Sequence, residues 1–359
     1  MKLKTILPYL LVIAIVVGIA VFAVIDRNNS NSLEAKPDKL RVQAGWLLNG
    51  EFANVCSAIV NGYYKDNNLD VELIPGGPSG ASFIVATTAI AQNPTLDIGI
   101  DGDLVPLLRG VAKNNKNEKL NVKAFAYFWN DNPYGFMVRT DSGIKSIKDF
   151  GKNKSNGQKV KVGVAADAVI QGAIANYAGV KEKDIDFVTV GFDATPLISG
   201  QVDALAGYWT SLAYELEKAN ISYTFLSVSE IPGLKQPSMI AVASTKTLTE
   251  KKDQLERWLK ATIKGSEFVI NNPEIAAKHI LDIRCGGPSF DEEQEAWLIK
   301  KSIPLFEKPI GMMNEKMMID YSLAYKNLDQ IPFAPDSNSF LDFSILSGIG
   351  IDKIDAKTK

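Results

Sequence analysis

Residues 69–101 have the sequence LDVELIPGGPSGASFIVATTAIAQNPTLDIGID, and this stretch decides the fold. A short apolar strand is predicted over Val71–Ile74, where the chain meets a Pro-Gly-Gly-Pro turn. A helix is predicted over Ala81–Gln92, and a second apolar strand follows over Leu96–Ile100. Two strands joined by a helix of this length form a parallel βαβ unit. The stretch therefore predicts an α/β fold.

The same alternation extends in both directions along the chain. Further strands are predicted over Leu40–Trp46, Val122–Trp129, Lys159–Ala165, Asp186–Val190 and Ala204–Tyr208. Between them, helices are predicted over Phe52–Tyr64, Leu104–Ala112, Val169–Tyr177, Pro196–Gly200 and Leu212–Ala219. From Leu248 the chain is mainly helical, over Lys251–Ile270, Pro273–Leu281, Asp291–Ser302 and Asn314–Leu328. This order predicts two α/β units followed by a helical return.

The 359 residues exceed what a single hydrophobic core holds, so two lobes are expected. We predict that the first lobe comprises residues 38–133 and 240–345, and the second lobe residues 134–239. Two crossing strands, near Asn132–Phe136 and Pro237–Ala241, would join them, and 346–359 would form a tail. In such a hinged protein a ligand binds in the cleft at the carboxyl ends of the strands.

The N-terminal segment, residues 1–25, is apolar and follows two lysines. The charge-free run Ile6–Ile25 is long enough to span a bilayer as a helix. Lys2 and Lys4 would stay in the cytoplasm, which predicts an extracytoplasmic body anchored to the membrane. The alternative is a cleaved signal peptide, because Val21-Phe22-Ala23 resembles a cleavage site. Residues 26–37 are polar and predict a flexible linker.

The charge balance excludes one class of partner. The chain has 39 Lys and Arg against 41 Asp and Glu, a net charge of −2. Since it contains no long basic run, we expect no nucleic-acid binding, and we expect a monomer.

Catalytic and metal-binding motifs are missing from the sequence. The single histidine, His279, lies in a predicted helix and is expected to be a packing or surface residue. With two cysteines and one histidine, a zinc site is not expected, and neither is a cofactor. Cys56 and Cys285 are expected to be two buried thiols, with a disulfide as the alternative outside the cytoplasm.

The candidate binding residues lie where the predicted strands end. Aromatic side chains that could stack on a ligand are Trp46, Phe52, Trp129, Tyr208 and, with its side chain on the opposite face, Trp209. Hydrogen-bond acceptors are expected from Asn49, Glu51, Asp101 and Asp167, and donors from Ser79 and the backbone of Gly76 and Gly77. Asp103, Asp167 and Asp193 are also expected to cap helix N-termini.

This set contains aromatic and acidic residues but no lysine or arginine. Such a site suits a neutral or weakly basic aromatic heterocycle that carries N–H or O–H donors. It should reject nitrate and sulfonates, which need positive charge or free helix N-termini.

Several segments resemble a known family. Gly62–Val71 (GYYKDNNLDV) resembles its Gly-Tyr-Phe and Gly-Leu-Asp-Val signature, with Asn68 in place of the glycine. Asp141–Ile144, Pro196–Ala204 and Trp258–Gly265 resemble its later segments. The family is that of ABC-importer solute-binding proteins for thiamine pyrimidine precursors, riboflavin, sulfonates and nitrate.

The resemblance implies a type II periplasmic-binding-protein fold, a small-molecule ligand in the interlobe cleft, and permease and ATPase partners. The Pro75–Pro78 turn and the Trp46 and Glu51–Ala53 segment are most similar to the branch that binds pyrimidine precursors and riboflavin.

Two alternatives remain within the same resemblance. One is a protein of the sulfonate and nitrate type. The other is a pyridoxal-phosphate-dependent enzyme that makes the thiamine pyrimidine, which resembles this fold but carries a cysteine cluster and a histidine near its site. Cys56, Cys285 and His279 do not form such a cluster in the sequence, so we expect no enzyme activity.

Overall fold

The computed structural model describes residues 36–79, 82–154, 156–165 and 170–351. The predicted membrane segment, most of the linker and residues 352–359 of the tail lie outside these residues, as does Asp167. Within the described part of the chain, no helix is both long enough and apolar enough to cross a membrane. From Lys39 onward the chain forms one compact unit.

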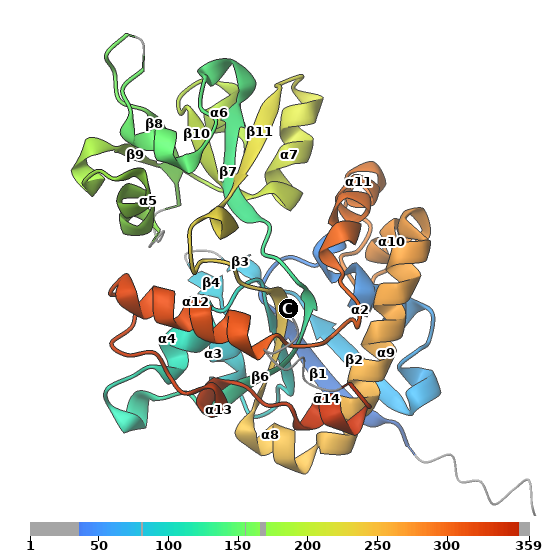
Figure 1. The fold of residues 1–359 in the computed structure, drawn as a ribbon. Coiled ribbons are helices and arrows are strands. Elements are labelled where there is room, and N and C mark those ends of the chain that lie inside the picture. Colours follow the sequence, from blue (N-terminus) through green and yellow to red (C-terminus); the bar gives the residue numbers. More distant parts are fainter. Residues whose placement is uncertain (1–35, 80–81, 155, 166–169, 352–359) are drawn as a thin grey trace, which may run out of the picture. The chain divides into compact units, whose positions relative to one another are not determined.

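The first sheet joins four strands from residues 38–129 to a fifth that follows the second sheet's strands in the chain (Figure 1). Its strands, in the order β2-β1-β5-β12-β6, are β2 (Leu69–Ile74), β1 (Asp38–Ala44), β5 (Ile98–Asp101), β12 (Ser238–Ser244) and β6 (Val122–Trp129). β1 and β5 are parallel, with Val42 opposite Ile98. β12 runs antiparallel to both β5 and β6, a direction that the sequence patterns did not predict for the crossing strand near Pro237–Ala241.

The second sheet is also mixed. Its order β11-β7-β10-β8-β9 comprises β11 (Tyr223–Ser227), β7 (Tyr134–Arg139), β10 (Ala204–Tyr208), β8 (Lys161–Val164) and β9 (Asp186–Thr189). β8 is parallel to β9 and β10, whereas β7 is antiparallel to β10 and β11. β11 is not among the strands predicted from sequence.

Helices follow most of the strands. They are α2 (Ala53–Val60), α3 (Ala86–Gln92), α4 (Val105–Val111), α5 (Gln171–Ala178), α6 (Thr195–Ile198), α7 (Trp209–Lys218), α8 (Thr245–Glu250), α9 (Lys252–Asn271), α10 (Pro273–Ile280), α11 (Glu292–Ser302), α12 (Glu315–Asn327), α13 (Ser337–Phe340) and α14 (Ser344–Gly348). α3 starts later than predicted, because a short hairpin of β3 (Gly77–Ser79) and β4 (Ser82–Ile84) precedes it.

α9 shows how the helical return reaches the core. Leu255, Trp258, Leu259 and Thr262 recur at helical spacing and are buried. Trp258 makes edge contacts with Phe125 of β6, whose ring centroid is 5.9 Å away. A Cβ on Gly265 would lie 2.1 Å from the Asn54 carbonyl oxygen, so only glycine permits this approach of α9 to α2.

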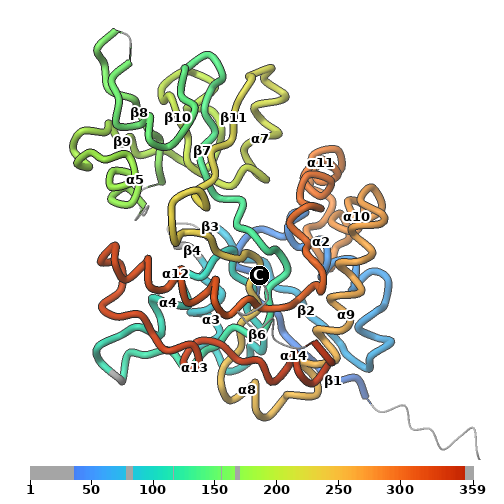
Figure 2. Tube along the Cα trace, viewed as in Figure 1, coloured from blue at the N-terminus to red at the C-terminus, as the bar shows by residue number. Residues whose placement is uncertain are grey.

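The chain passes twice between the sheets, before β7 and after β11 (Figure 2). We name these passages the crossovers, residues 130–133 and 228–237. Ser229 Oγ donates to Asp131 Oδ1 at 2.7 Å and links the two crossovers. Asn132 Nδ2 donates to the Gly102 carbonyl oxygen at 3.0 Å, and Ser238 Oγ donates to the same oxygen. The crossovers are therefore fixed to each other and to the loop after β5.

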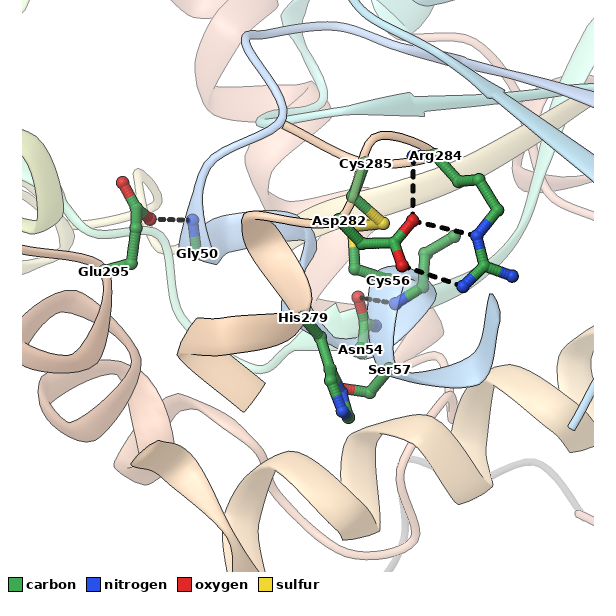
Figure 3. Close-up of a disulfide and its surroundings, with 10 residues drawn as sticks. Gly50, Asn54, Cys56, Ser57, His279, Asp282, Arg284, Cys285 and Glu295 are labelled. Carbon is green, nitrogen blue, oxygen red and sulfur yellow. Dashed lines mark hydrogen bonds and ion pairs between the residues drawn. A yellow bond between two sulfur atoms is a disulfide. The ribbon is translucent and has the colours of Figure 1, made fainter. Parts of the chain in front are cut away.

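A disulfide joins Cys56 of α2 to Cys285 in the loop after α10, with their Cα atoms 5.8 Å apart (Figure 3). The expectation of two free thiols is wrong, because the fold brings together residues that are 229 positions apart. His279 of α10 lies nearby, with Nδ1 3.1 Å from Ser57 Oγ and its ring stacked on Phe268. These contacts agree with the predicted packing role of His279.

Candidate functional site

The segment after β1 enters a 3-10 helix, η2 (Gly50–Phe52). Asn49 caps this helix, because its Oδ1 accepts a hydrogen bond from the Glu51 backbone N–H at 3.1 Å. Phe52 is buried in the hydrophobic core, with 2% of its surface exposed. Asn49 and Phe52, both predicted to bind the ligand, thus have structural roles that fix the position of Glu51.

Glu51 is buried and makes its contact with the part of the chain that belongs to the second sheet. Its Oε1 accepts a hydrogen bond from Thr210 Oγ1 of α7 at 2.7 Å. Burial raises the pKa of Glu51 to about 7, although the Thr210 bond lowers it. Near neutral pH the carboxyl can therefore be either a donor or an acceptor.

A second buried carboxyl, Glu295 of α11, lies on the other side of Gly50. Glu295 accepts a hydrogen bond from the Gly50 backbone N–H (Figure 3). Burial raises the pKa of Glu295 to about 7, and the charge of Glu51 adds to this effect. Each of the two carboxyls therefore opposes ionisation of the other, which favours a proton or a positively polarised group nearby.

Asp101, at the end of β5, has a different environment. Its Oδ1 accepts from the Ala86 backbone N–H at 2.9 Å, and its Oδ2 accepts from the Thr87 backbone N–H at 2.8 Å and from the Thr87 hydroxyl. Burial raises the pKa of Asp101, and these hydrogen bonds oppose the shift. Asp101 thus caps the N-terminus of α3 from outside the helix. Three hydrogen bonds from the protein thus use most of the acceptor capacity of the Asp101 carboxylate, which was predicted from sequence to accept from a ligand.

Asp103 and Tyr208 bring the two sheets together near the crossovers. Tyr208 Oη is 3.4 Å from Asp103 Oδ2, and the Tyr208 ring makes an edge contact with Tyr134, with centroids 5.7 Å apart. Asp103 Oδ1 accepts from the Val105 backbone N–H at 2.8 Å, as predicted for a cap at the start of α4. Burial raises the pKa of Asp103 to about 6, the charge of Asp101 raises it further, and Arg109 lowers it.

Trp46 contacts an aromatic residue from the second sheet's side. Its ring lies edge-on to Phe192, with centroids 5.8 Å apart, and Phe192 is 59% exposed. Gly76 holds this loop in place, because its backbone N–H donates to the Trp46 carbonyl oxygen at 2.9 Å. A Cβ on Gly76 would lie 2.1 Å from the Ala44 carbonyl oxygen, whereas Gly77 has a φ of +85°. These glycines therefore shape the loop, and the Gly76 N–H is already used.

The remaining predicted site residues lie apart from this group. Trp129 is 1% exposed and packs edge-on against Phe306, so it belongs to the core. Trp209 packs beside Phe225 in the second sheet's hydrophobic cluster. Trp209 begins α7 and β10 ends at Tyr208, so the strand alternation predicted for these two residues does not apply. The side chain of Ser79 and all of Asp167 lie outside what the structure describes.

Sequence reasoning missed Thr210, Glu295, Phe192 and Arg109. Thr210 and Glu295 lie in amphipathic helices, where nothing in the local pattern marks them as site residues. Phe192 had a usable signal, because it lies two residues after a predicted strand, next to Asp193. Among the described residues, no group of three or more His, Cys, Asp and Glu side chains could hold a metal ion.

Relatives in sequence share most of the chain. Residues 49–276 match the family model described as "NMT1/THI5 like". A protein of Haemophilus influenzae, whose name refers to thiamine biosynthesis, is 24% identical over 312 residues, which is 80% of this chain and 90% of the relative. The formylaminopyrimidine-binding protein of Halalkalibacterium halodurans is 22% identical over 280 residues, 75% of this chain and 78% of the relative.

Solved structures show the same fold at lower identity. The periplasmic nitrate-binding protein of Synechocystis PCC 6803 superposes with a TM-score of 0.65 at 9% identity, covering 88% of this chain and 89% of that one. The desulfurization enzyme DSZB superposes with a TM-score of 0.55 at 11% identity, covering 87% and 98%. This chain has the two-sheet α/β fold of the periplasmic binding proteins and belongs to the NMT1/THI5-like family.

Proposed function

We propose that this chain is the extracytoplasmic solute-binding subunit of an ABC-type importer, and that it binds a small aromatic heterocycle between two lobes. The solute classes that we favour are thiamine pyrimidine precursors and, as a second choice, riboflavin. Membership of the family and the name of the formylaminopyrimidine-binding relative support this proposal.

The contact between Glu51 and Thr210 carries the proposal. It joins the start of η2, beside the first sheet, to α7, which belongs to the second sheet. Trp46 with Phe192, and Asp103 with Tyr208, join the same two parts of the chain. Aromatic and carboxyl groups are thus concentrated where the sheets meet, as expected for a site between hinged lobes.

The chemistry of these groups favours a particular kind of solute. Trp46 offers a ring face or edge, and Glu51 Oε2 offers a carboxyl oxygen beside the one that Thr210 uses. An aminopyrimidine presents adjacent N–H donors and ring-nitrogen acceptors on a flat aromatic frame. Because burial raises the pKa of Glu51 to about 7, this carboxyl can match either pattern.

An anion-binding function is the second candidate, since the nitrate-binding protein shares the fold. Its identity of 9% supports a shared fold alone. The buried Glu51 and Glu295 would repel an anion placed beside them, which disfavours nitrate and sulfonates at this position.

Enzyme activity is the third candidate, because one structural neighbour is a desulfurization enzyme. We propose that this chain returns its solutes unchanged. Incubation of the purified body with pyrimidine precursors and flavins, followed by mass spectrometry, tests this, and turnover of any of them would refute it.

The direct test of binding is a thermal-shift series. Hydroxymethylpyrimidine, formylaminopyrimidine and riboflavin are compared with nitrate and taurine at equal concentrations. At a concentration a hundred times Kd, a ligand stabilises the folded state by about 2.7 kcal/mol. We expect stabilisation by one of the heterocycles, and stabilisation by the anions alone would favour the second candidate.

The permease and ATPase partners and the membrane anchor are also part of this proposal. The mass of the mature protein isolated from its own host would separate a retained anchor from a cleaved signal. A monomer is expected, and light scattering measures it.

A further inference from the structure

We infer that Trp297 is a positioning residue for solute binding, because its contact with α7 holds the second sheet's part of the chain against the first. Three residues on one face of α7 reach across. Thr210, Tyr214 and Glu217 are spaced by four and three positions, so they lie along one side of the helix. Their partners lie on η2 and α11.

The contact with α11 involves four side chains, and we name it the α7–α11 contact. Trp297 Nε1 donates to Glu217 Oε2 at 2.8 Å, and the Trp297 ring is tilted against Tyr214, with centroids 5.6 Å apart. Lys301 Nζ lies 3.9 Å from Glu217 Oε1. In Figure 1, α7 lies beside the second sheet and faces α11, which lies beside α10. α11 also contacts η2.

The geometry makes this contact sensitive to the angle between the sheets. α7 begins at the first crossover, where the Trp209 backbone N–H donates to the Pro133 carbonyl oxygen at 3.1 Å. Glu217 lies eight residues further on, roughly 12 Å along the helix axis at about 1.5 Å per residue. A rotation about the crossovers therefore moves Glu217 away from α11 further than it moves the start of α7. The α7–α11 contact can exist only when the sheets are close together.

The contact is weak enough to be reversible. Glu217 and Lys301 are 42% and 53% exposed, so their ion pair contributes little. The hydrogen bond from the indole to a carboxylate and the packing of Trp297 on Tyr214 contribute more. Losing the hydrogen bond should shift the balance from closed to open by roughly three- to tenfold. Apparent affinity for a solute falls by at most this factor, because the apparent dissociation constant is the intrinsic one divided by the closed fraction.

Glu217 offers a matched control. Its Oε1 also accepts a hydrogen bond from Tyr223 Oη at 3.1 Å, and Tyr223 lies on β11 in the same part of the chain as α7. Trp297→Phe removes the hydrogen bond from α11 to Glu217 of α7. Tyr223→Phe removes a hydrogen bond to the same carboxylate that stays within the second sheet and its helix α7. Both substitutions keep an aromatic ring.

The experiment is small-angle X-ray scattering of the ligand-free body. We expect a larger radius of gyration for Trp297→Phe than for the unmodified protein, and no change for Tyr223→Phe. Glu217→Ala changes an exposed residue, so it keeps the fold intact and should open the protein as Trp297→Phe does. An unchanged radius for both Trp297→Phe and Glu217→Ala, or an equal increase for Tyr223→Phe, would overturn the inference.

The effect on affinity rests on the proposed function and is measured separately with hydroxymethylpyrimidine. Trp297→Phe should weaken its binding by up to roughly tenfold, with Tyr223→Phe within error of the unmodified protein. If the unmodified protein does not bind the pyrimidine, the proposed solute is wrong, and the scattering result still decides the role of Trp297. If the unmodified protein binds the pyrimidine and Trp297→Phe and Tyr223→Phe bind it equally well, the positioning role of Trp297 is contradicted.

Discussion

Asp101 and Glu51 are two buried acids that occupy similar places in the sequence and different places in the protein. Asp101 is the last residue of β5 and Glu51 follows β1, and the two side chains are 5% and 6% exposed. Asp101 accepts three hydrogen bonds from the start of α3, which packs on the same sheet. Glu51 accepts its hydrogen bond from Thr210 of α7, beside the other sheet.

The difference shows how nearby backbone N–H groups decide which part of the protein a buried acid contacts. Backbone N–H groups at the N-terminus of α3 have no partner within the helix and donate to the Asp101 carboxylate. Gly50 N–H, beside Glu51, is instead used by Glu295. Glu51 is therefore left to interact with groups that arrive from the second sheet, of which Thr210 is one.

The largest expected effect tests what holds the Glu51 region in place. Cys56 and Cys285 join α2, which directly follows η2, to the loop before α11. Reduction, or Cys56→Ser with Cys285→Ser, should lower the free energy of unfolding by about 2–4 kcal/mol. Urea unfolding with and without a reductant measures this, and identical curves would show that the disulfide adds no stability.

A slightly smaller loss is expected at Asp101. Asp101→Ala leaves the Ala86 and Thr87 backbone N–H groups without their acceptor and should destabilise the fold by about 2–3 kcal/mol. Asp193→Ala is the matched control, since the exposed Asp193 accepts from the Thr195 N–H in the same way. Asp193→Ala should lower the free energy of unfolding by at most about 1 kcal/mol, measured by thermal or urea unfolding. Equal losses would mean that burial of the Asp101 carboxyl does not matter.

Glu51 should instead give the protein a pH dependence. Its pKa is about 7 in the folded state against 4.5 as the ordinary value, so the folded chain binds more protons between these values. The contribution of Glu51 to stability is therefore greatest at low pH and falls as the pH rises from about 4.5 to 7. Glu51→Gln should remove this fall, so at pH 8 its free energy of unfolding should exceed that of the native chain by roughly 1–3 kcal/mol. Urea unfolding of both proteins at pH 5 and pH 8 measures this. If the difference in free energy of unfolding between Glu51→Gln and the native chain is the same at both pH values, the raised pKa is contradicted.

The smallest expected effect concerns the aromatic pair. Trp46→Ala should weaken binding of the pyrimidine by roughly tenfold, because the ring at the meeting of the two sheets is lost. Trp129→Phe changes a core tryptophan and should leave affinity unchanged. Fluorescence titration measures the pyrimidine affinity of both variants. A larger loss in Trp129→Phe than in Trp46→Ala would mean that the solute does not bind beside Trp46.

Sequence patterns predicted the strands with continuous apolar runs, such as β6 and β10, with their observed bounds. They missed β11 and the antiparallel direction of β12, because strand direction depends on where the chain returns rather than on local periodicity. For the candidate site, Trp46 and Tyr208 could be placed from the sequence at or just after strand ends, and Glu51 on the segment that follows the first strand. Whether an acid such as Asp101 is already used by a helix depends on distances that only the fold sets.

The most direct measurement is calorimetric titration of hydroxymethylpyrimidine into the native chain, Glu51→Gln and Asp101→Asn. We predict saturable binding by the native chain, a loss of roughly tenfold or more in Glu51→Gln, and less than about a twofold change in folded Asp101→Asn. Heat of binding with nitrate but with no aromatic heterocycle, or equal losses in the two variants, would contradict the proposal that Glu51 binds an aromatic solute between the sheets.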